Sequence, residues 1–205
     1  MQPDDIGILG GTFDPVHDGH IALAYSVLDA LGIDELRFMP TGTPNFKQHR
    51  DVTPAAQRVA MLELAIADEP RFVLDAREVE RGGVTYTADT LESLSAEFPG
   101  ARLNFVIGAD AACTLPTWRR AARLAELARF VVALRGTVTA EQVRAALERG
   151  EARFDVLFID IAPVDVSSTG IREAIACGQR DIAGLPPAVL SYIREQGLYA
   201  SGRES

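Results

Sequence analysis

Two of the three histidines in this chain, His17 and His20, lie three positions apart, just after the paired glycines Gly10 and Gly11. An apolar run precedes the glycines and an amphipathic stretch follows the histidines, an order that predicts a buried strand, a turn and then a helix. Paired glycines let the backbone approach a ligand closely, and a helix start offers unpaired N–H groups to an anion. Because imidazoles can also donate hydrogen bonds to phosphate oxygens, the junction predicts a phosphate site, with a nucleotide as the expected ligand.

Two common phosphate-binding motifs do not fit this segment. It lacks the Gly-Lys-Ser/Thr ending of a P-loop, and it does not match G-x-G-x-x-G. A P-loop hydrolase and an ordinary dehydrogenase are therefore not supported. The remaining alternative is a structural turn followed by two unrelated histidines. The spacing i, i+3 places two helical side chains beside each other and favours a shared site.

Further loops with chemically useful side chains follow other predicted strands. Positive groups in them could bind phosphate, and the single tryptophan could stack on a planar ring. The alternatives are a solvated loop, a hydrophobic cap over the core and simple helix capping by Ser and Thr. The residues concerned are Lys47, His49 and Arg50 after the second strand, Asp110 and Trp118 after the fourth, Arg135 at the end of the fifth, and Ser168, Thr169 and Arg172 after the last.

Strands and helices alternate along the chain, which predicts an α/β fold with a doubly wound, mainly parallel sheet and helices on both faces. Ligands of such sheets bind at the carboxyl ends of the strands, where these loops lie. We expect a single domain, residues 1–205, with a C-terminal helical portion at about 167–200. The expected strands are 6–9, 35–39, 72–75, 103–107, 130–134 and 158–161, and the expected helices are 20–31, 54–67, 88–97, 119–128, 169–177 and 187–196.

The composition indicates a globular protein of the cytoplasm. The chain has 205 residues, of which 47% are hydrophobic and 24% charged, and its formal net charge is −9. The negative charge argues against a nucleic-acid partner, which needs a basic surface. The acidic N-terminal residues do not form a signal peptide, and no apolar run is long enough to span a membrane. Cys113 and Cys177 have no metal-type spacing and are expected to be reduced.

Several blocks together resemble one family. Residues 17–20, His-Asp-Gly-His after Gly-Gly-Thr-Phe-Asp-Pro, resemble the H-x-G-H signature of the nucleotidyltransferase superfamily, and residues 167–172 resemble its I-S-S-T-x-I-R signature. Residues 85–91, Thr-Tyr-Thr-Ala-Asp-Thr-Leu, resemble the S-Y-T-x-x-T-L block of bacterial nicotinate-nucleotide adenylyltransferases. Further similar blocks are 61–65, 105–110, 115–118 and 192–199. One departure is Pro44-Asn45-Phe46-Lys47, where the family often has P-P-H-K.

The resemblance implies a Rossmann-like fold and the reaction of ATP with nicotinate mononucleotide to give nicotinate adenine dinucleotide and pyrophosphate. The acceptor is an ionised phosphate monoester, so no dedicated general base is needed. Catalysis then depends on in-line positioning and on stabilising charge on the α- and β-phosphates. The resemblance implies Mg²⁺ bound with the ATP and no metal held by the protein. It leaves open whether the chain forms a homo-oligomer.

The resemblance also implies roles for individual residues. The implied catalytic residues are His17, His20, Lys47 and Arg172, with His20 at the α-phosphate. The implied ATP-binding residues are Gly10, Gly11, Thr12, Phe13, His17, His20, Arg135, Ser168, Thr169 and Arg172. Those implied for nicotinate mononucleotide are Thr12, Lys47, Thr87, Gly108, Asp110, Trp118 and Arg119. In this set Trp118 stacks on the ring, Thr87 and the backbone N–H of Arg119 receive the carboxylate, and Asp110 binds a ribose hydroxyl.

Two other functions remain open from the sequence. One is a sister adenylyltransferase with nicotinamide mononucleotide or phosphopantetheine as acceptor, against which residues 85–91 and 115–118 argue. The other is a nucleotide-binding protein without catalysis, which would not need to keep both histidines, Lys47 and Arg172. The sequence does not determine the strictness of base selection, the divalent ion used, the motion of residues 44–50 or the role of His49.

Overall fold

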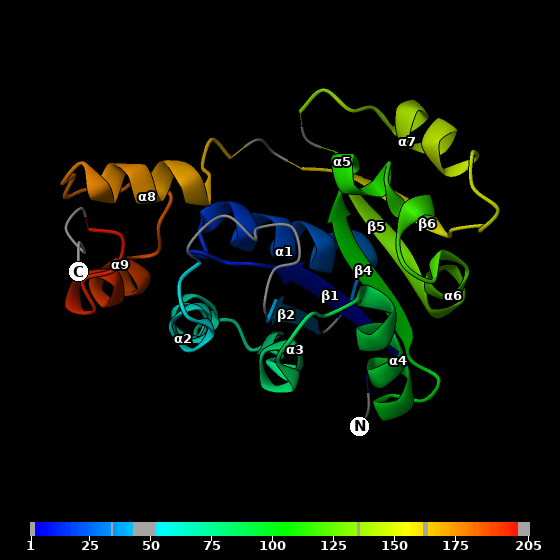
Figure 1. Ribbon diagram of the computed structural model, residues 1–205, viewed down its shortest axis with the longest axis horizontal. Coiled ribbons are helices and arrows are strands. Elements are labelled where there is room, and N and C mark those ends of the chain that lie inside the picture. The colour runs from blue at the N-terminus through cyan, green and yellow to red at the C-terminus, as the bar shows by residue number, and fades with distance from the viewer. Residues whose placement is uncertain (1–2, 34, 43–51, 135, 162–163, 201–205) are drawn as a thin grey trace.

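Six strands form one parallel sheet in the computed structural model, which describes residues 3–33, 35–42, 52–134, 136–161 and 164–200 (Figure 1). The sheet order within these residues is β3-β2-β1-β4-β5-β6, and every neighbouring pair is parallel. The chain thus builds outward in one direction from β1 and in the other from β4, which confirms the doubly wound fold. The strands are β1 Asp5–Gly11, β2 Leu36–Pro40, β3 Phe72–Leu74, β4 Arg102–Gly108, β5 Ala128–Leu134 and β6 Val156–Asp160.

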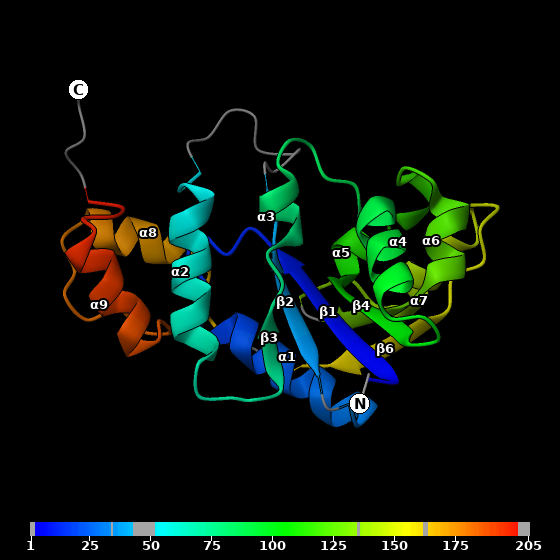
Figure 2. The same cartoon turned by 90° about the horizontal axis from the view of Figure 1, so that it is seen from below.

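Helices cover both faces of the sheet (Figure 2). Buried residues of α1, α2, α8 and α9 pack against one face, and those of α4, α5, α6 and α7 pack against the other. In the described part of the chain the helices are α1 Asp18–Leu31, α2 Ala55–Ile66, α3 Arg77–Arg81, α4 Thr87–Glu97, α5 Ala109–Ala112, η1 Leu115–Thr117, α6 Ala121–Leu127, α7 Ala140–Leu147, α8 Ser168–Ala176 and α9 Pro187–Glu195.

The central strand β1 is apolar because both of its faces are covered, as expected for a parallel sheet. Ile6 and Ile8 point into one buried cluster and Leu9 into the other, in keeping with the two-residue period of a strand. The strand lies between β2 and β4, where the winding of the sheet changes direction. Its carboxyl end is therefore the place where a ligand is expected in this type of fold.

The last two helices, α8 and α9, lie at one end of the sheet beside α2 (Figures 1 and 2). Val189 and Ile193 of α9 are buried in the same cluster as Leu9 of β1 and Leu62 of α2. This shared apolar contact holds the C-terminal helices against the helices that follow β1 and β2. As a result, the start of α8 lies against the turn that precedes α1.

Short helices were missed by the sequence analysis. The helices α3, α5 and α7 are too short to show a clear 3.6-residue apolar period, although Thr139 and Gln142 form a capping box before α7. The expected helix 119–128 begins only at Ala121, because Arg120 has a left-handed backbone with φ of 61°. Ala128 belongs instead to β5. These differences matter for the site, since Asp110 lies in α5 and Arg119 lies in the turn before α6.

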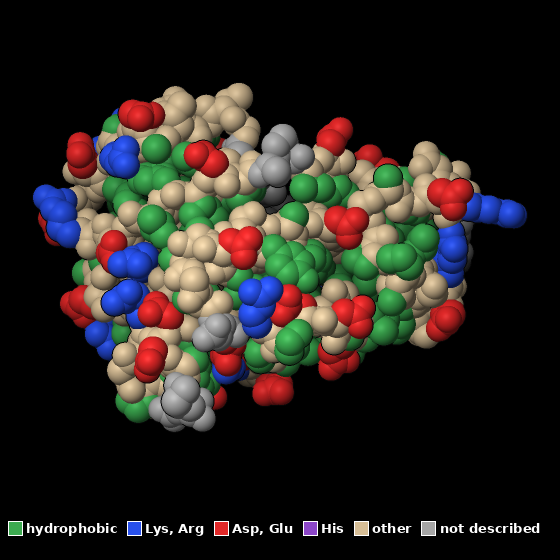
Figure 3. All heavy atoms as spheres, turned by 180° about the vertical axis from the view of Figure 1, so that it is seen from behind, with side chains coloured by type: hydrophobic (Ala, Val, Ile, Leu, Met, Phe, Trp, Pro, Cys, Tyr) green, Lys and Arg blue, Asp and Glu red, His purple; other side chains and the backbone are tan. Residues whose placement is uncertain are grey.

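Charged side chains of both signs are interspersed over the face that Figure 3 displays. This face therefore carries no patch of a single charge sign, although the net charge of the chain is −9. Among the described residues, no helix has the length and apolar character needed to cross a membrane.

Candidate active site

The turn after β1 is built around close packing of glycine and an aromatic ring. A Cβ added at Gly11 would lie only 2.8 Å from the ring of Phe13, so a side chain at this position would displace the ring. Phe13 is 1% exposed and has a φ of 49°, which folds its ring beneath the turn. The ring then packs edge-on against His20, with 4.9 Å between the ring centroids. The buried ring of Phe13 therefore packs against His20 and does not face a ligand.

His17 and His20 form one stacked pair at the start of α1. Their ring centroids are 3.8 Å apart and the planes differ by 25°. The backbone N–H of His17 donates a hydrogen bond to Nδ1 of His20, at 3.3 Å. An Nδ1 atom that accepts this bond carries no proton, so we assign the proton of the neutral ring to Nε2. His20 can then donate from Nε2 while its other nitrogen is held by the backbone.

Gly19, between the two histidines, allows another segment to approach closely. A Cβ at this position would lie 3.1 Å from the imidazole of His17 and 3.1 Å from Val166. Both distances are tighter than ordinary contacts. A side chain at position 19 would therefore have to displace His17 or Val166 where the start of α1 meets the segment that leads to α8.

Hydrogen bonds tie the start of α8 to the turn after β1. The hydroxyl of Ser168 donates to the carbonyl of Pro15 at 3.0 Å. The guanidinium of Arg172 donates to the carbonyl of Asp14 and, at 2.9 Å, to the hydroxyl of Thr169. The two helix starts, each with a partial positive charge, thus meet at one place. This brings together five residues that the sequence assigned to phosphate: His17, His20, Ser168, Thr169 and Arg172.

The carboxylate of Asp14 lies inside this junction and is only 3% exposed. It accepts a hydrogen bond of 2.7 Å from the hydroxyl of Tyr199, which follows α9. Burial raises the pKa of Tyr199, and the bond to Asp14 raises it further because it needs the protonated phenol. The sequence analysis gave neither side chain a role, since nothing in the local sequence indicates that residues 185 positions apart will meet.

Arg58 in α2 is a second buried charge that the sequence analysis missed. Its side chain is 1% exposed and donates to backbone carbonyls on both sides, including that of Thr12 at 2.8 Å. Burial lowers the pKa of Arg58, and the nearby Asp14 carboxylate opposes that shift. A signal was present in the sequence, because Arg58 interrupts the apolar face that Met61 and Leu62 continue.

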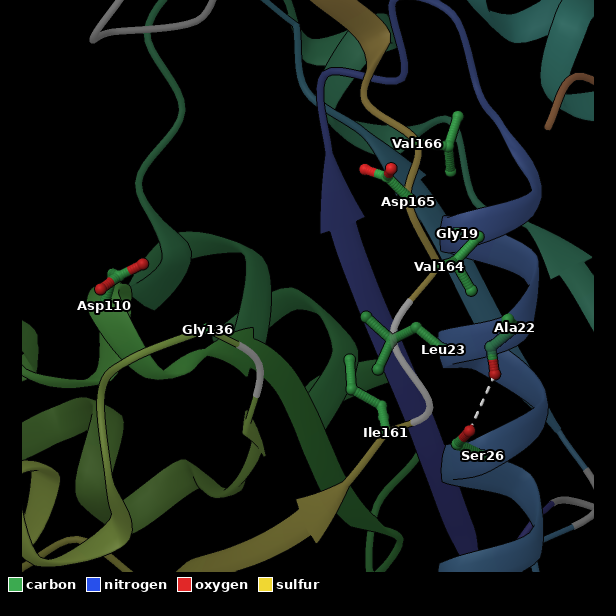
Figure 4. A pocket seen from close by; sticks show the side chains of 10 residues that line it. All are labelled: Gly19, Ala22, Leu23, Ser26, Asp110, Gly136, Ile161, Val164, Asp165 and Val166. Atoms are coloured by element: carbon green, nitrogen blue, oxygen red, sulfur yellow. Dashed lines mark hydrogen bonds between the residues drawn. The ribbon is translucent and has the colours of Figure 1, made fainter. Parts of the chain in front are cut away.

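A cavity of about 530 Å³ opens beside the N-terminal half of α1. Figure 4 shows Asp110 on one side of it and the α1 side chains Leu23 and Ser26 on the other. Its remaining lining residues are Gly19, Ala22, Gly136, Ile161, Val164, Asp165 and Val166. The wall is mostly small or apolar, which suits a flat heterocycle, and Asp110 and Asp165 supply acceptors for hydroxyl or amino groups.

A second cavity, of about 400 Å³, lies between the start of α4, the 3-10 helix η1 and the start of α6. It brings together Thr87, Trp118 and Arg119, as the sequence predicted, and is also lined by Thr85, Tyr86, Thr114, Thr117 and Leu124. The indole N–H of Trp118 donates to the hydroxyl of Thr114 at 2.9 Å, which fixes the orientation of the ring. The guanidinium of Arg119 stacks over the ring of Tyr86 at 4.2 Å. Asp110 does not line this cavity but the one beside α1.

The remaining residues assigned from the sequence fall into two groups. Gly10 and Gly11 are the last two residues of β1, and Gly108 is the last residue of β4, so all three lie at the carboxyl edge of the sheet. Thr12 follows β1 directly. Lys47, His49, Arg50 and Arg135 lie outside the described residues, as do residues 44–50 as a whole. Within the part of the chain that is described, no three His, Cys, Asp or Glu side chains are grouped as a metal site would require. Cys113 and Cys177 are both free.

Comparisons with known proteins agree on one family. A family profile described as cytidylyltransferase-like matches residues 8–174. The nicotinate-nucleotide adenylyltransferase of Bacillus subtilis (strain 168) is 40% identical over 196 residues, which are 96% of this chain and 98% of that protein. A Corynebacterium kroppenstedtii protein named "Probable nicotinate-nucleotide adenylyltransferase" is 40% identical over 195 residues, 95% of this chain and 90% of that protein.

A similar solved structure is the Plasmodium falciparum nicotinic acid mononucleotide adenylyltransferase complexed with NaAD. Its TM-score is 0.77 at 21% identity, with 96% of this chain and 97% of that chain covered. At this level of identity the likeness supports the fold.

Replacing Tyr199 with Phe tests the buried bond to Asp14. We expect Tyr199→Phe to lower the free energy of unfolding by about 2 kcal/mol, because it removes the hydrogen bond of a buried carboxylate. Urea unfolding at pH 7 measures the change. Tyr192→Phe in α9 is the matched control, since the described part of the chain shows no hydrogen bond from that hydroxyl. Equal losses in the two variants would contradict the role given to Tyr199.

Proposed function

The chain belongs to the nicotinate-nucleotide adenylyltransferases of the cytidylyltransferase-like family, and from this premise we propose that it transfers the adenylyl group of ATP to nicotinate mononucleotide. The products are nicotinate adenine dinucleotide and pyrophosphate, a step of NAD biosynthesis. The observation that carries the proposal is the junction of two helix starts, with His17, His20, Ser168 and Arg172, together with two separate cavities, of which the one beside α1 is lined by Gly19 of the junction. A reaction that joins two nucleotides through their phosphates needs this arrangement.

In the proposed reaction an oxygen of the phosphate of nicotinate mononucleotide attacks the α-phosphorus of ATP. A new P–O bond forms on one side while the bond between the α-phosphorus and its bridging oxygen breaks on the other, releasing pyrophosphate. The attacking phosphate is already ionised near neutral pH, because its second pKa is about 6. No proton has to be removed, so the side chains at the junction position groups and stabilise charge.

His20 is the proposed donor to the α-phosphate. Its Nδ1 accepts the backbone N–H of His17, which leaves the Nε2 proton for a phosphate oxygen. His17 and the α8 start, with Ser168, Thr169 and Arg172, then hold the rest of the triphosphate. Ser168 and Arg172 already bond the carbonyls of Pro15 and Asp14, so they also fix the turn while they bind. The family resemblance implies Arg135 as a further contact to the triphosphate and Lys47 as a phosphate contact that also serves nicotinate mononucleotide.

The two cavities give the nucleosides separate places. The adenosine of ATP fits the cavity beside α1, where Asp110 can accept a hydrogen bond from a ribose hydroxyl and Gly19 leaves room for the base. This moves Asp110 from the acceptor nucleotide, to which the sequence analysis assigned it, to the ATP side. The nicotinate ring fits the cavity of Trp118, with its carboxylate at Thr87 and the N–H of Arg119. A carboxamide would match these donors less well.

The proposed metal is Mg²⁺ that arrives with ATP, in line with the divalent ion that nucleotidyltransferases of this kind use. Phosphate oxygens are hard ligands that suit it, and within the described residues no acidic cluster offers a protein-held alternative. Bound in this way the ion supplies positive charge to the phosphates. We place the reaction in the cytoplasm, with small-molecule partners, in keeping with the composition and the absence of a basic surface on the face in Figure 3.

A direct assay tests the activity. We expect the purified chain with ATP and Mg²⁺ to release pyrophosphate and form the dinucleotide with nicotinate mononucleotide, at a kcat/KM at least about tenfold above that with nicotinamide mononucleotide. Chromatography of the products identifies the dinucleotide. Turnover of phosphopantetheine alone would assign a sister activity, and binding of ATP without turnover of any acceptor would exclude catalysis.

His20→Ala tests the donor to the α-phosphate. Loss of a donor that acts on transition-state charge is expected to lower kcat by about 100-fold or more. The KM for each substrate should change much less, because most binding contacts remain. Thermal unfolding of the variant checks that the fold is intact. A folded variant with a near-normal rate would remove His20 from the phosphate site.

Trp118→Ala tests the ring platform. We expect the KM for nicotinate mononucleotide to rise by about tenfold, close to 1.4 kcal/mol of lost stacking, and the KM for ATP to stay nearly constant. Trp118→Phe is the matched control, because it keeps an aromatic face while it loses the bond to Thr114. Steady-state kinetics with each substrate varied in turn gives both constants. Equal effects on the two KM values would contradict stacking at Trp118.

A further inference from the structure

The buried side chain of Arg58 contacts three separate segments of the chain at the edge of the proposed site. Its guanidinium donates to the carbonyls of Thr12 at 2.8 Å, Thr41 at 2.8 Å, Gly42 at 3.0 Å and Thr53 at 2.9 Å. Thr12 follows β1, Thr41 and Gly42 follow β2, and Thr53 precedes α2. One guanidinium therefore bonds the turn after β1, the chain that leaves β2 and the chain that enters α2, and fixes the distances between them.

Only an arginine suits this position. The guanidinium carries five N–H donors in a rigid plane, and here its three nitrogens all donate to carbonyl oxygens. A lysine would keep the charge, but its three donors sit on one atom and cannot reach carbonyls on opposite sides. Because the side chain is 1% exposed, water cannot replace a lost bond without rearrangement of these segments.

Gly42 also lies very close to the backbone of α3. A Cβ added at Gly42 would lie 2.7 Å from the carbonyl oxygen of Glu78 in α3, a contact between backbones that leaves no room to give. The carboxylate of Glu78 in turn accepts a bond of 2.7 Å from Thr90 in α4. Burial raises the pKa of Glu78, and the bond from Thr90 opposes that rise. Gly42 thus lies between Arg58 and α3, and the Glu78 side chain links α3 to α4, whose first residue, Thr87, lines the Trp118 cavity.

The backbone completes the connection to β1. The N–H of Thr41 donates to the carbonyl of Gly11 at 2.9 Å, so the exits of β1 and β2 are bonded directly beside the guanidinium. A continuous series of contacts therefore runs from the turn at Gly11 and Thr12, through Arg58 and Gly42, to the elements behind the ring cavity. The steps are hydrogen bonds, apart from the approach of Gly42 to the backbone of Glu78, which leaves no space for a side chain.

We propose that Arg58 is a positioning residue for adenylyl transfer, which sets the phosphate-binding turn at the correct distance from the Trp118 cavity. The inference rests on the proposed function. Arg58 lines neither cavity, and its hydrogen bonds go to the carbonyls of Thr12, Thr41, Gly42 and Thr53. Each substrate keeps its own binding surface when Arg58 is changed, and what is lost is the alignment of the two phosphates.

Arg58→Lys tests this assignment by separating kcat from KM. We expect kcat to fall by at least tenfold, because small misplacements of reacting groups are costly, while the KM for each substrate changes by less than about threefold. The rate is normalised to sites that bind ATP in calorimetry without acceptor, so that an unfolded fraction does not imitate the loss. A normal kcat, or a loss confined to one KM, would overturn the proposal.

Arg37→Lys is the matched control for a general loss of stability. Arg37 in β2 is also largely buried and bonds Glu35 at 2.6 Å and Asp75 at 3.2 Å, but it pairs with Ile8, away from the carboxyl edge of the sheet. We expect Arg37→Lys to lower the melting temperature and to leave kcat within twofold. An equal fall of kcat in the control would mean that Arg58 acts through stability alone.

Gly42→Ala provides a second test if Arg58→Lys does not fold. The added methyl group would push Gly42 away from Glu78 and shift its carbonyl at the guanidinium, and it is expected to lower kcat by at least fivefold at nearly constant KM. Unchanged kinetics in this variant would contradict the proposal.

Hydrogen exchange gives a readout that does not depend on activity. Amides of residues 10–12 and 41–42 should exchange at least tenfold faster in Arg58→Lys than in Arg37→Lys, and equal rates would overturn the positioning role. If the unmodified chain forms no dinucleotide, the proposed function fails while the exchange result still decides whether Arg58 fixes these segments.

Discussion

The close contact between the turn after β1 and the start of α8 is the constraint on which the rest of the structure depends. Gly19 permits the approach, since a side chain there would meet both His17 and Val166. The hydroxyl of Ser168 and the guanidinium of Arg172 then bond the carbonyls of Pro15 and Asp14. Two helix starts with partial positive charge are held together in this way, although each alone would be only a weak anion site. The apolar cluster shared by β1, α2 and α9 supports this contact from below.

Buried polar groups hold the turn after β1 in place on its inner side. Asp14 accepts from Tyr199, and Arg58 donates to carbonyls of the three segments that approach it. Burial of such groups is unfavourable unless every donor and acceptor finds a partner, so each of them admits few alternative arrangements. The core beneath the turn after β1 is therefore specified by hydrogen bonds as well as by packing. This rigidity suits a reaction that depends on alignment, with no acid–base step.

The two cavities have different linings, and under the proposed function this difference would let one site select two nucleotides independently. The cavity beside α1 is lined by small and apolar residues with Asp110 at its edge, whereas the other offers the ring of Trp118 and the start of α4. In the proposed arrangement the adenosine and the pyridine ring meet different elements, and only the phosphates share a common place. Under this proposal, changes in the Trp118 cavity would alter base selection without altering the recognition of ATP.

The local order of strand, turn and helix was enough to predict the doubly wound fold, which the structure confirms, and a phosphate site at His17 and His20, which stays a prediction. The family resemblance of residues 85–91 and 115–118 predicted a shared role for Thr87, Trp118 and Arg119, and these three residues do line one cavity. Only the tertiary structure decided that Asp110 faces the cavity beside α1, that Tyr199 meets Asp14, and that Arg58 is buried among carbonyls. These contacts join residues up to 185 positions apart, so they depend on how complete elements pack. No local pattern of residues can encode that packing, and the roles of Lys47 and Arg135 stay predictions.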